Sequence, residues 1–153
     1  MGLGIIMRLL VVLAGLIAGT LPAAASGGIW CILEDQSVRL SIESGVTHGM
    51  GSPFFNFRGK LEVLDASVPQ KLRTAEFEQQ HLAQHWVDGR VLKLHLYREW
   101  EVDNSFDYVD LVIETQASEE GVYDGSYTMT VFDSAGAEGK RTALGGKISC
   151  GAE

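Results

Sequence analysis

Apolar and polar residues alternate one by one along most of the chain after Gln36, and this pattern constrains the fold more than any other feature of the sequence. In the stretch SVRLSIESGV, the residues Val38, Leu40 and Ile42 share one face, while serine, arginine and glutamate occupy the other. A period of two is typical of a strand with one buried face, because successive side chains of a strand point to opposite sides. The pattern therefore predicts β structure.

The same alternation recurs to the end of the chain. It predicts the following inward-facing residues: Phe55, Phe57, Leu61 and Val63; Leu92, Leu94 and Leu96; Val109, Leu111 and Ile113; Tyr123, Tyr127, Met129 and Val131; Leu144, Ile148 and Cys150. Short segments rich in turn-forming residues separate these stretches, and Asp88-Gly89 is typical of a two-residue hairpin turn. We expect about seven to nine strands in a mainly β fold, as a single antiparallel β-sandwich or an up-and-down β-barrel.

One segment departs from the pattern. Thr74 is a suitable N-cap, glutamates follow in the first turn, and good helix-forming residues continue to Gln84. A strand here would bury His81 and His85 without an evident polar partner, which costs free energy. We therefore predict one short helix over about residues 75–85.

Two cysteines, Cys31 and Cys150, stand near opposite ends of the chain. Their spacing does not suit a structural zinc site, which uses closely spaced pairs of ligands. It also lacks the local Cys-x-x-Cys arrangement of redox centres. Trp30 beside Cys31 argues against lipid attachment. Both cysteines have inward parity, so we expect a disulfide that joins the N- and C-terminal strands and holds their Cα atoms within about 7 Å.

The N-terminal segment resembles a secretory signal peptide, because Arg8 precedes an apolar run that ends in Pro22 and small residues. We expect residues 1–25 to be removed after Ala25, leaving 26–153 as a single β domain with no stable membrane anchor. Met7 is an alternative start. A removed leader together with a disulfide predicts a periplasmic or secreted protein.

Charge limits the classes of partner. The chain carries 12 basic and 20 acidic residues, a formal net charge of −8, so no nucleic-acid partner is expected. Between Glu99 and Gly139 there is no lysine or arginine. Calcium could bind oxygen-rich loops there through Asp103, Asn104 and Asp107, but no spaced calcium loop is present. A solvated acidic face is the interpretation that we favour for this run.

Histidines offer one metal hypothesis. On a helix, His81 and His85 would share a face, as metal-binding histidines often do, and His95 follows in the sequence. No glutamate of a His-Glu-x-x-His motif accompanies them. Two exposed histidines on a helix surface are the simpler interpretation, and we predict no cofactor.

Aromatic residues beside flexible loops offer a binding hypothesis. The candidate residues are Trp100, Phe106, Tyr108, Met50 and Phe54, which flank an acidic connection and a glycine-rich one. Loops at the end of a rigid β scaffold often carry recognition. Caps on the hydrophobic core are the alternative role for the same side chains.

No nucleophile elbow or phosphate-binding loop occurs in the sequence. The sequence therefore favours an exported, non-catalytic binding or protein-interaction module of the bacterial envelope, with a protein or small molecule as its partner. One alternative is a barrel-type carrier with a cavity lined by Phe57, Leu94 and Tyr127. A metal-dependent or carboxylate-based hydrolase is the other.

Overall fold

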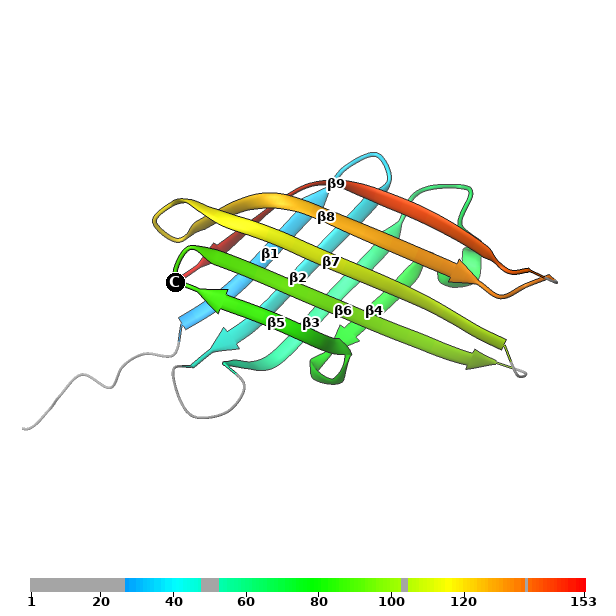
Figure 1. Ribbon diagram of the computed structural model, residues 1–153, viewed down its shortest axis with the longest axis horizontal. Coiled ribbons are helices and arrows are strands. Elements are labelled where there is room, and N and C mark those ends of the chain that lie inside the picture. The colour runs from blue at the N-terminus through cyan, green and yellow to red at the C-terminus, as the bar shows by residue number, and fades with distance from the viewer. Residues whose placement is uncertain (1–26, 48–52, 103–104, 137) are drawn as a thin grey trace, which may run out of the picture.

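The computed structural model describes residues 27–47, 53–102, 105–136 and 138–153. These residues form strands and two short 3₁₀ turns (Figure 1). The elements are β1 (Gly27–Glu34), β2 (Val38–Val46), β3 (Phe54–Val63), η1 (Gln70–Leu72), β4 (Thr74–Glu78), η2 (Gln79–His81), β5 (Leu82–Asp88), β6 (Val91–Val102), β7 (Ser105–Glu119), β8 (Val122–Asp133) and β9 (Lys140–Ala152).

All the strands belong to one antiparallel sheet that curls into a nearly closed barrel. Its order is β4-β3-β2-β1-β9-β8-β7-β6-β5, so consecutive strands are neighbours in the sheet except β4 and β5, which form its two edges. Among the described strands, the one pairing between non-consecutive strands joins β9 to β1. The predicted mainly β fold is confirmed, and it is a barrel rather than a sandwich.

Strands β4 and β5 are two halves of one bent strand. Eight antiparallel pairings separate them in the sheet, so both run in the same sense. Only η2 lies between them. The first half pairs with β3 and the second half with β6, which brings the front and back layers of Figure 1 together at this corner.

The predicted helix over residues 75–85 is therefore wrong. Ala75 and Phe77 alternate inward on β4, where they are 5% and 1% exposed. The histidines do not carry the expected cost of burial. His81 is only partly buried, and its Nδ1 accepts a hydrogen bond from the backbone N–H of Glu78 at 2.9 Å. The ring of His85 lies edge-on to Phe54, with centroids 5.0 Å apart.

Side chains bridge the seam of the barrel, which is the break in strand pairing between the two edges of the sheet. On one side, the Arg98 guanidinium of β6 donates to the backbone carbonyl of Glu76 on β4. On the other side, the backbone N–H of Phe57 on β3 donates to Oε1 of Gln79 at 3.2 Å. These contacts satisfy backbone groups of β3 and β4 that would otherwise lack partners in a neighbouring strand.

The alternating residues fill the barrel as predicted along most of their length. Leu96, Val109, Leu111 and Ile113 are 0% exposed, and Tyr127 is 1% exposed. Val46, Tyr123 and Leu144 are partly buried against this core.

The predicted inward position of Phe55 is wrong. Phe55 is 37% exposed and Phe54 is 2% exposed, so the neighbouring residue takes the inward place. Asn56 adopts a positive φ of 53°, and the pairing of β2 with β3 shifts register between Glu43 and Gly45. This irregularity reverses the parity of β3 before Phe57.

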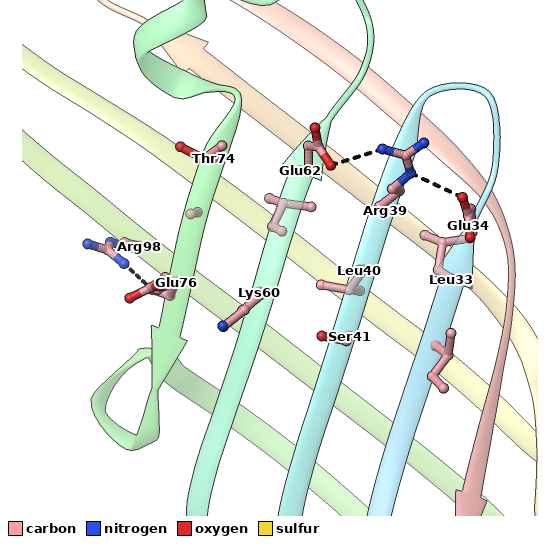
Figure 2. Close-up of a pocket in the computed structure, with 13 residues that line it drawn as sticks. Leu33, Glu34, Arg39, Leu40, Ser41, Lys60, Glu62, Thr74, Glu76 and Arg98 are labelled. Atoms are coloured by element: carbon pink, nitrogen blue, oxygen red, sulfur yellow. Dashed lines mark hydrogen bonds and ion pairs between the residues drawn. The ribbon is translucent and has the colours of Figure 1, made fainter.

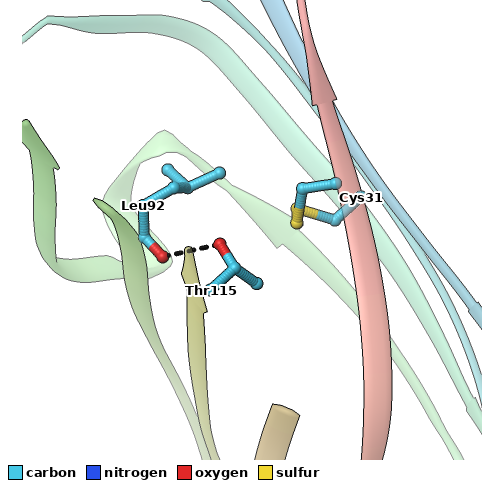
Figure 3. Close-up of a disulfide and its surroundings, with 4 residues drawn as sticks. Cys31, Leu92 and Thr115 are labelled. Carbon is cyan, nitrogen blue, oxygen red and sulfur yellow. Dashed lines mark hydrogen bonds between the residues drawn. A yellow bond between two sulfur atoms is a disulfide. The ribbon is translucent and has the colours of Figure 1, made fainter. Parts of the chain in front are cut away.

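The predicted disulfide is confirmed. Cys31 of β1 and Cys150 of β9 are directly opposite in the sheet and are joined by an S–S bond of 2.04 Å (Figure 3). Both are buried, as is the nearby Thr115, whose Oγ donates to the carbonyl of Leu92 at 2.8 Å. The bridge fixes the pairing that joins the N- and C-terminal strands.

Candidate functional site

A groove of about 730 Å³ crosses the outer face of β1 to β4 (Figure 2). Its volume lies within the range of about 300–1,000 Å³ that is common for ligand pockets. One wall carries Ile32, which is 64% exposed. Strands β2 to β4 contribute Ser41, Lys60 and Thr74, and Arg98 reaches in from β6. Alternation explains this surface, because the outward residues of four neighbouring strands must share one face.

Charged side chains of both signs surround the groove. At one end, Nε of Arg39 lies 3.1 Å from Glu34 and Nη1 lies 3.2 Å from Glu62 (Figure 2). These hydrogen bonds, first that to Glu62 and then that to Glu34, raise the pKa of Arg39. Within the described residues, Lys60 makes no ion pair, so its ammonium is available to a ligand or partner.

A second depression, of about 530 Å³, lies on the other side of β1. It is lined by Ile32 together with Asp124, Lys147 and Ser149 of β8 and β9. Hydrogen bonds from Ser118 and Ser149 hold the pKa of Asp124 below its usual value. Ile32 therefore stands between two polar depressions as an exposed apolar side chain.

Two buried carboxylates meet at the end of the barrel where β3 passes to β4. Lys71 of η1 places its Nζ 2.7 Å from Asp107 and 2.9 Å from Asp133. The N–H and hydroxyl of Ser134 donate to the other oxygen of Asp107, at 2.9 and 2.8 Å. Burial would raise the pKa of Asp107, but the hydrogen bonds from Lys71 and Ser134 outweigh burial and lower it. Both carboxylates are thus engaged in holding η1 on the barrel.

Sequence reasoning did not predict this cluster. The alternation placed Asp133 at an inward position of β8, beside Val131, and Asp107 at an inward position of β7, beside Val109. Charged residues with inward parity at strand ends are a usable signal, because a buried carboxylate needs a partner. The identity of that partner depends on how η1 folds.

The predicted loop aromatics do not form one surface. Trp100 packs against the core beneath Arg98, whose guanidinium carbon lies 5.1 Å from the indole centroid. Tyr108 faces outward, Phe106 is 51% exposed, and Phe54 is buried. Met50 lies outside the described residues. The proposed binding role of these five residues stays a prediction, although the four described side chains point to different sides of the sheet.

Sequence reasoning also did not predict a row of aromatic side chains on the outer face of β6 to β8. Tyr108 lies between Tyr97 and Phe132, at centroid distances of 5.6 and 5.1 Å, and Arg141 covers Phe132 at 5.5 Å. The hydroxyl of Tyr97 donates to Glu99 at 2.7 Å, and this hydrogen bond, with burial, raises the pKa of Tyr97 to about 12. Because the stacked rings cover each other's faces, they form cross-strand packing rather than an open platform for a ligand.

The helix that would align the predicted metal ligands does not form. His81 lies on η2 and His85 on β5, so the shared helical face does not exist. Burial, with a smaller contribution from the charge of Arg98, lowers the pKa of His81. His95 faces the opposite side of the sheet and bonds Asp110 at 2.9 Å. In the described part of the chain, no group of three or more histidine, cysteine, aspartate or glutamate side chains could hold a metal ion. Of the proposed calcium ligands, Asp103 and Asn104 lie outside the described residues.

The fold and its surface define a disulfide-closed antiparallel β-barrel with charged depressions on its outside. The chain matches no protein-family model, no curated protein and no solved structure at the significance required. None of the helical turns in the described residues has the length and apolar character needed to cross a membrane.

Proposed function

We propose that this protein is an exported, non-catalytic module that binds a partner protein through the outer face of β1. The observation that carries the proposal is the exposure of Ile32, at 64%, between depressions of about 730 and 530 Å³. An exposed apolar side chain flanked by charged and polar groups matches the pattern of a protein interface, in which an apolar centre is surrounded by a polar rim. Trp30, on the same face and 40% exposed, extends the apolar strip.

Packing inside the barrel favours this proposal over a small-ligand carrier. A carrier requires space beside Phe57, Leu94 and Tyr127, and these side chains are 3%, 1% and 1% exposed within the hydrophobic core. A hydrolase is also less favoured, because Lys71 engages both Asp107 and Asp133. Export is supported by the apolar leader and by the disulfide, since disulfides persist in oxidising compartments.

The test is a pull-down with three forms of the mature, oxidised protein. Each form is immobilised on a resin and incubated with an extract from the envelope of its own cells. The three forms are the wild type, Ile32→Glu and a matched control, Thr128→Glu, which adds the same charge at an exposed position of β8. We expect one partner to be retained by the wild type and the control, and to bind Ile32→Glu about tenfold more weakly. Equal retention by Ile32→Glu, or no retained partner, would reject the proposal.

A further inference from the structure

The two edges of the sheet differ in how they are protected. An exposed edge presents unpaired backbone N–H and C=O groups, and proteins usually shield such edges with charged side chains, proline, shortness or a covering group. Strand β4 has several of these features. It is five residues long, its outward residues include Glu76 and Glu78, and the Arg98 guanidinium covers the carbonyl of Glu76.

Strand β5 has almost none of them. It is seven residues long, contains no lysine, arginine or proline, and carries one charge, Asp88, at its end. Among the described strands it pairs with β6 alone. A register irregularity between Leu82 and Gln84 affects only its beginning, so Gln84–Asp88 pairs regularly. In an antiparallel ladder half of the backbone groups point away from the paired strand, so β5 offers a regular, unshielded edge.

Exposed apolar side chains lie on both faces of this edge. Trp86 is 59% exposed on the outer face and Val87 is 42% exposed on the inner face. A strand added beside β5 would cover both, since its side chains also alternate between the two faces.

We propose that β5 pairs antiparallel with β5 of a second copy of this chain, across a two-fold axis, so that the sheet continues through the interface. Such an interface is self-complementary, as the symmetry of a two-fold dimer requires. Pairing centred on His85 sets Gln84 of one copy beside Trp86 of the other, twice. It also places the two Asp88 carboxylates at opposite ends of the ladder, so no like charges face each other.

Charge and size set the strength of this dimer. Each full chain has a formal net charge of −8, so two copies repel, and added salt should strengthen the dimer by screening that repulsion. One seven-residue strand pair is smaller than a standard stable interface. The dimer is therefore weak and depends on protein concentration.

Sedimentation velocity of the purified, oxidised protein tests the proposal over about a hundredfold range of concentration, at low and at moderate salt. We expect the mean mass of the wild type to rise toward that of a dimer with concentration, and to rise further with salt. The double variant Trp86→Lys/Val87→Lys should remain a monomer. Phe106→Lys, an exposed aromatic on β7, is the matched control and should dimerise like the wild type.

Hydrogen exchange of the wild type gives a measurement that does not depend on any variant. Amides of Gln84–Asp88 should exchange more slowly as concentration rises, whereas those of Thr74–Glu78 should not change. A wild type that stays monomeric throughout, a dimer that survives the double variant, or protection on β4 instead of β5 would each overturn the proposal. Ile32→Glu should dimerise normally, because Ile32 lies on β1 and the groove beside it is lined by no residue of β5.

Discussion

Nζ of Lys71 lies 2.7 Å from Oδ2 of Asp107, although the two residues are 36 positions apart in the sequence. The contact fastens the connection between β3 and β4 to the start of β7, across one end of the barrel. Val68 and Leu72, which flank Lys71, are 1% and 2% exposed and fill that end from the same connection. The ion pair and these two apolar side chains therefore close this end of the barrel together.

Replacing Lys71 by methionine should destabilise the fold. Removing one partner of a buried ion pair costs about 3–5 kcal/mol, but the Lys71 side chain is 52% exposed, so we expect a smaller loss of about 2 kcal/mol. Denaturant unfolding of Lys71→Met measures this. Lys60→Met, which removes an exposed lysine that has no ion pair with any described residue, should change stability by less than about 0.5 kcal/mol. Equal effects of the two variants would contradict the role of Lys71.

Stability should fall in acid. Burial would raise the pKa values of Asp35 and Asp107, but the hydrogen bonds that each accepts outweigh burial and lower both. A carboxyl group with a lowered pKa stabilises the fold above its unfolded pKa of about 3.9, and this contribution is lost as pH falls through the folded pKa. Unfolding midpoints in urea should thus be steady from about pH 7 to 5 and decline below about pH 4.

The variant Asp107→Asn isolates one part of that decline. It should be less stable than the wild type at neutral pH, and its stability should fall less steeply in acid because one contributing carboxyl is gone. Asp88→Asn, at an exposed position, should keep the slope of the wild type. If Asp107→Asn also keeps that slope, Asp107 does not contribute to the acid sensitivity.

Loss of the disulfide should be the largest single change. The bridge spans 119 residues, and the chain-entropy model gives about 4–5 kcal/mol for a loop of this length. Guanidinium unfolding of Cys31→Ala/Cys150→Ala, compared with the oxidised wild type, measures the loss. A difference below about 1 kcal/mol would mean that the pairing of β1 with β9 holds without the bridge.

The seam should loosen when Arg98 is replaced by methionine. The carbonyl of Glu76 then loses its donor, and we expect a loss of about 1 kcal/mol together with faster amide exchange in Thr74–Glu78. The control is Arg90→Met, in the turn between β5 and β6. Unchanged exchange in β4 would show that the guanidinium does not protect this edge.

Strand content and the disulfide could be predicted because their signals are local. Alternation identifies the inward face of each strand without knowledge of its neighbours, and Cys31 and Cys150 share that face with residues such as Ile29 and Ile148. The bent strand could not be predicted in this way. Residues 75–85 include good helix formers, and pairing of Ala75 and Phe77 with β3 overrides that preference.

The groove on the outer face of β1 to β4 could not be predicted from the sequence for a related reason. Ile32, Ser41 and Lys60 become neighbours only through the register of β1 to β3, and turn lengths alone do not specify that register. The aromatic row of Tyr97, Tyr108 and Phe132 depends in the same way on how β6 to β8 align. Parity identifies which side of the sheet a residue occupies, but not what lies beside it.

The pairing of β1 with β9 has a consequence for assembly. Among the described strands, every other pairing joins strands that are consecutive in the chain, so two meanders, β1–β4 and β5–β9, can each form from local hairpins. Only the β1–β9 ladder requires the ends of the chain to meet, and contacts of such high sequence separation form slowly. We therefore expect the two meanders to dock late, in the rate-limiting step of folding. Until then the two thiols should remain accessible to oxidising catalysts, and afterwards the disulfide is buried between β1 and β9.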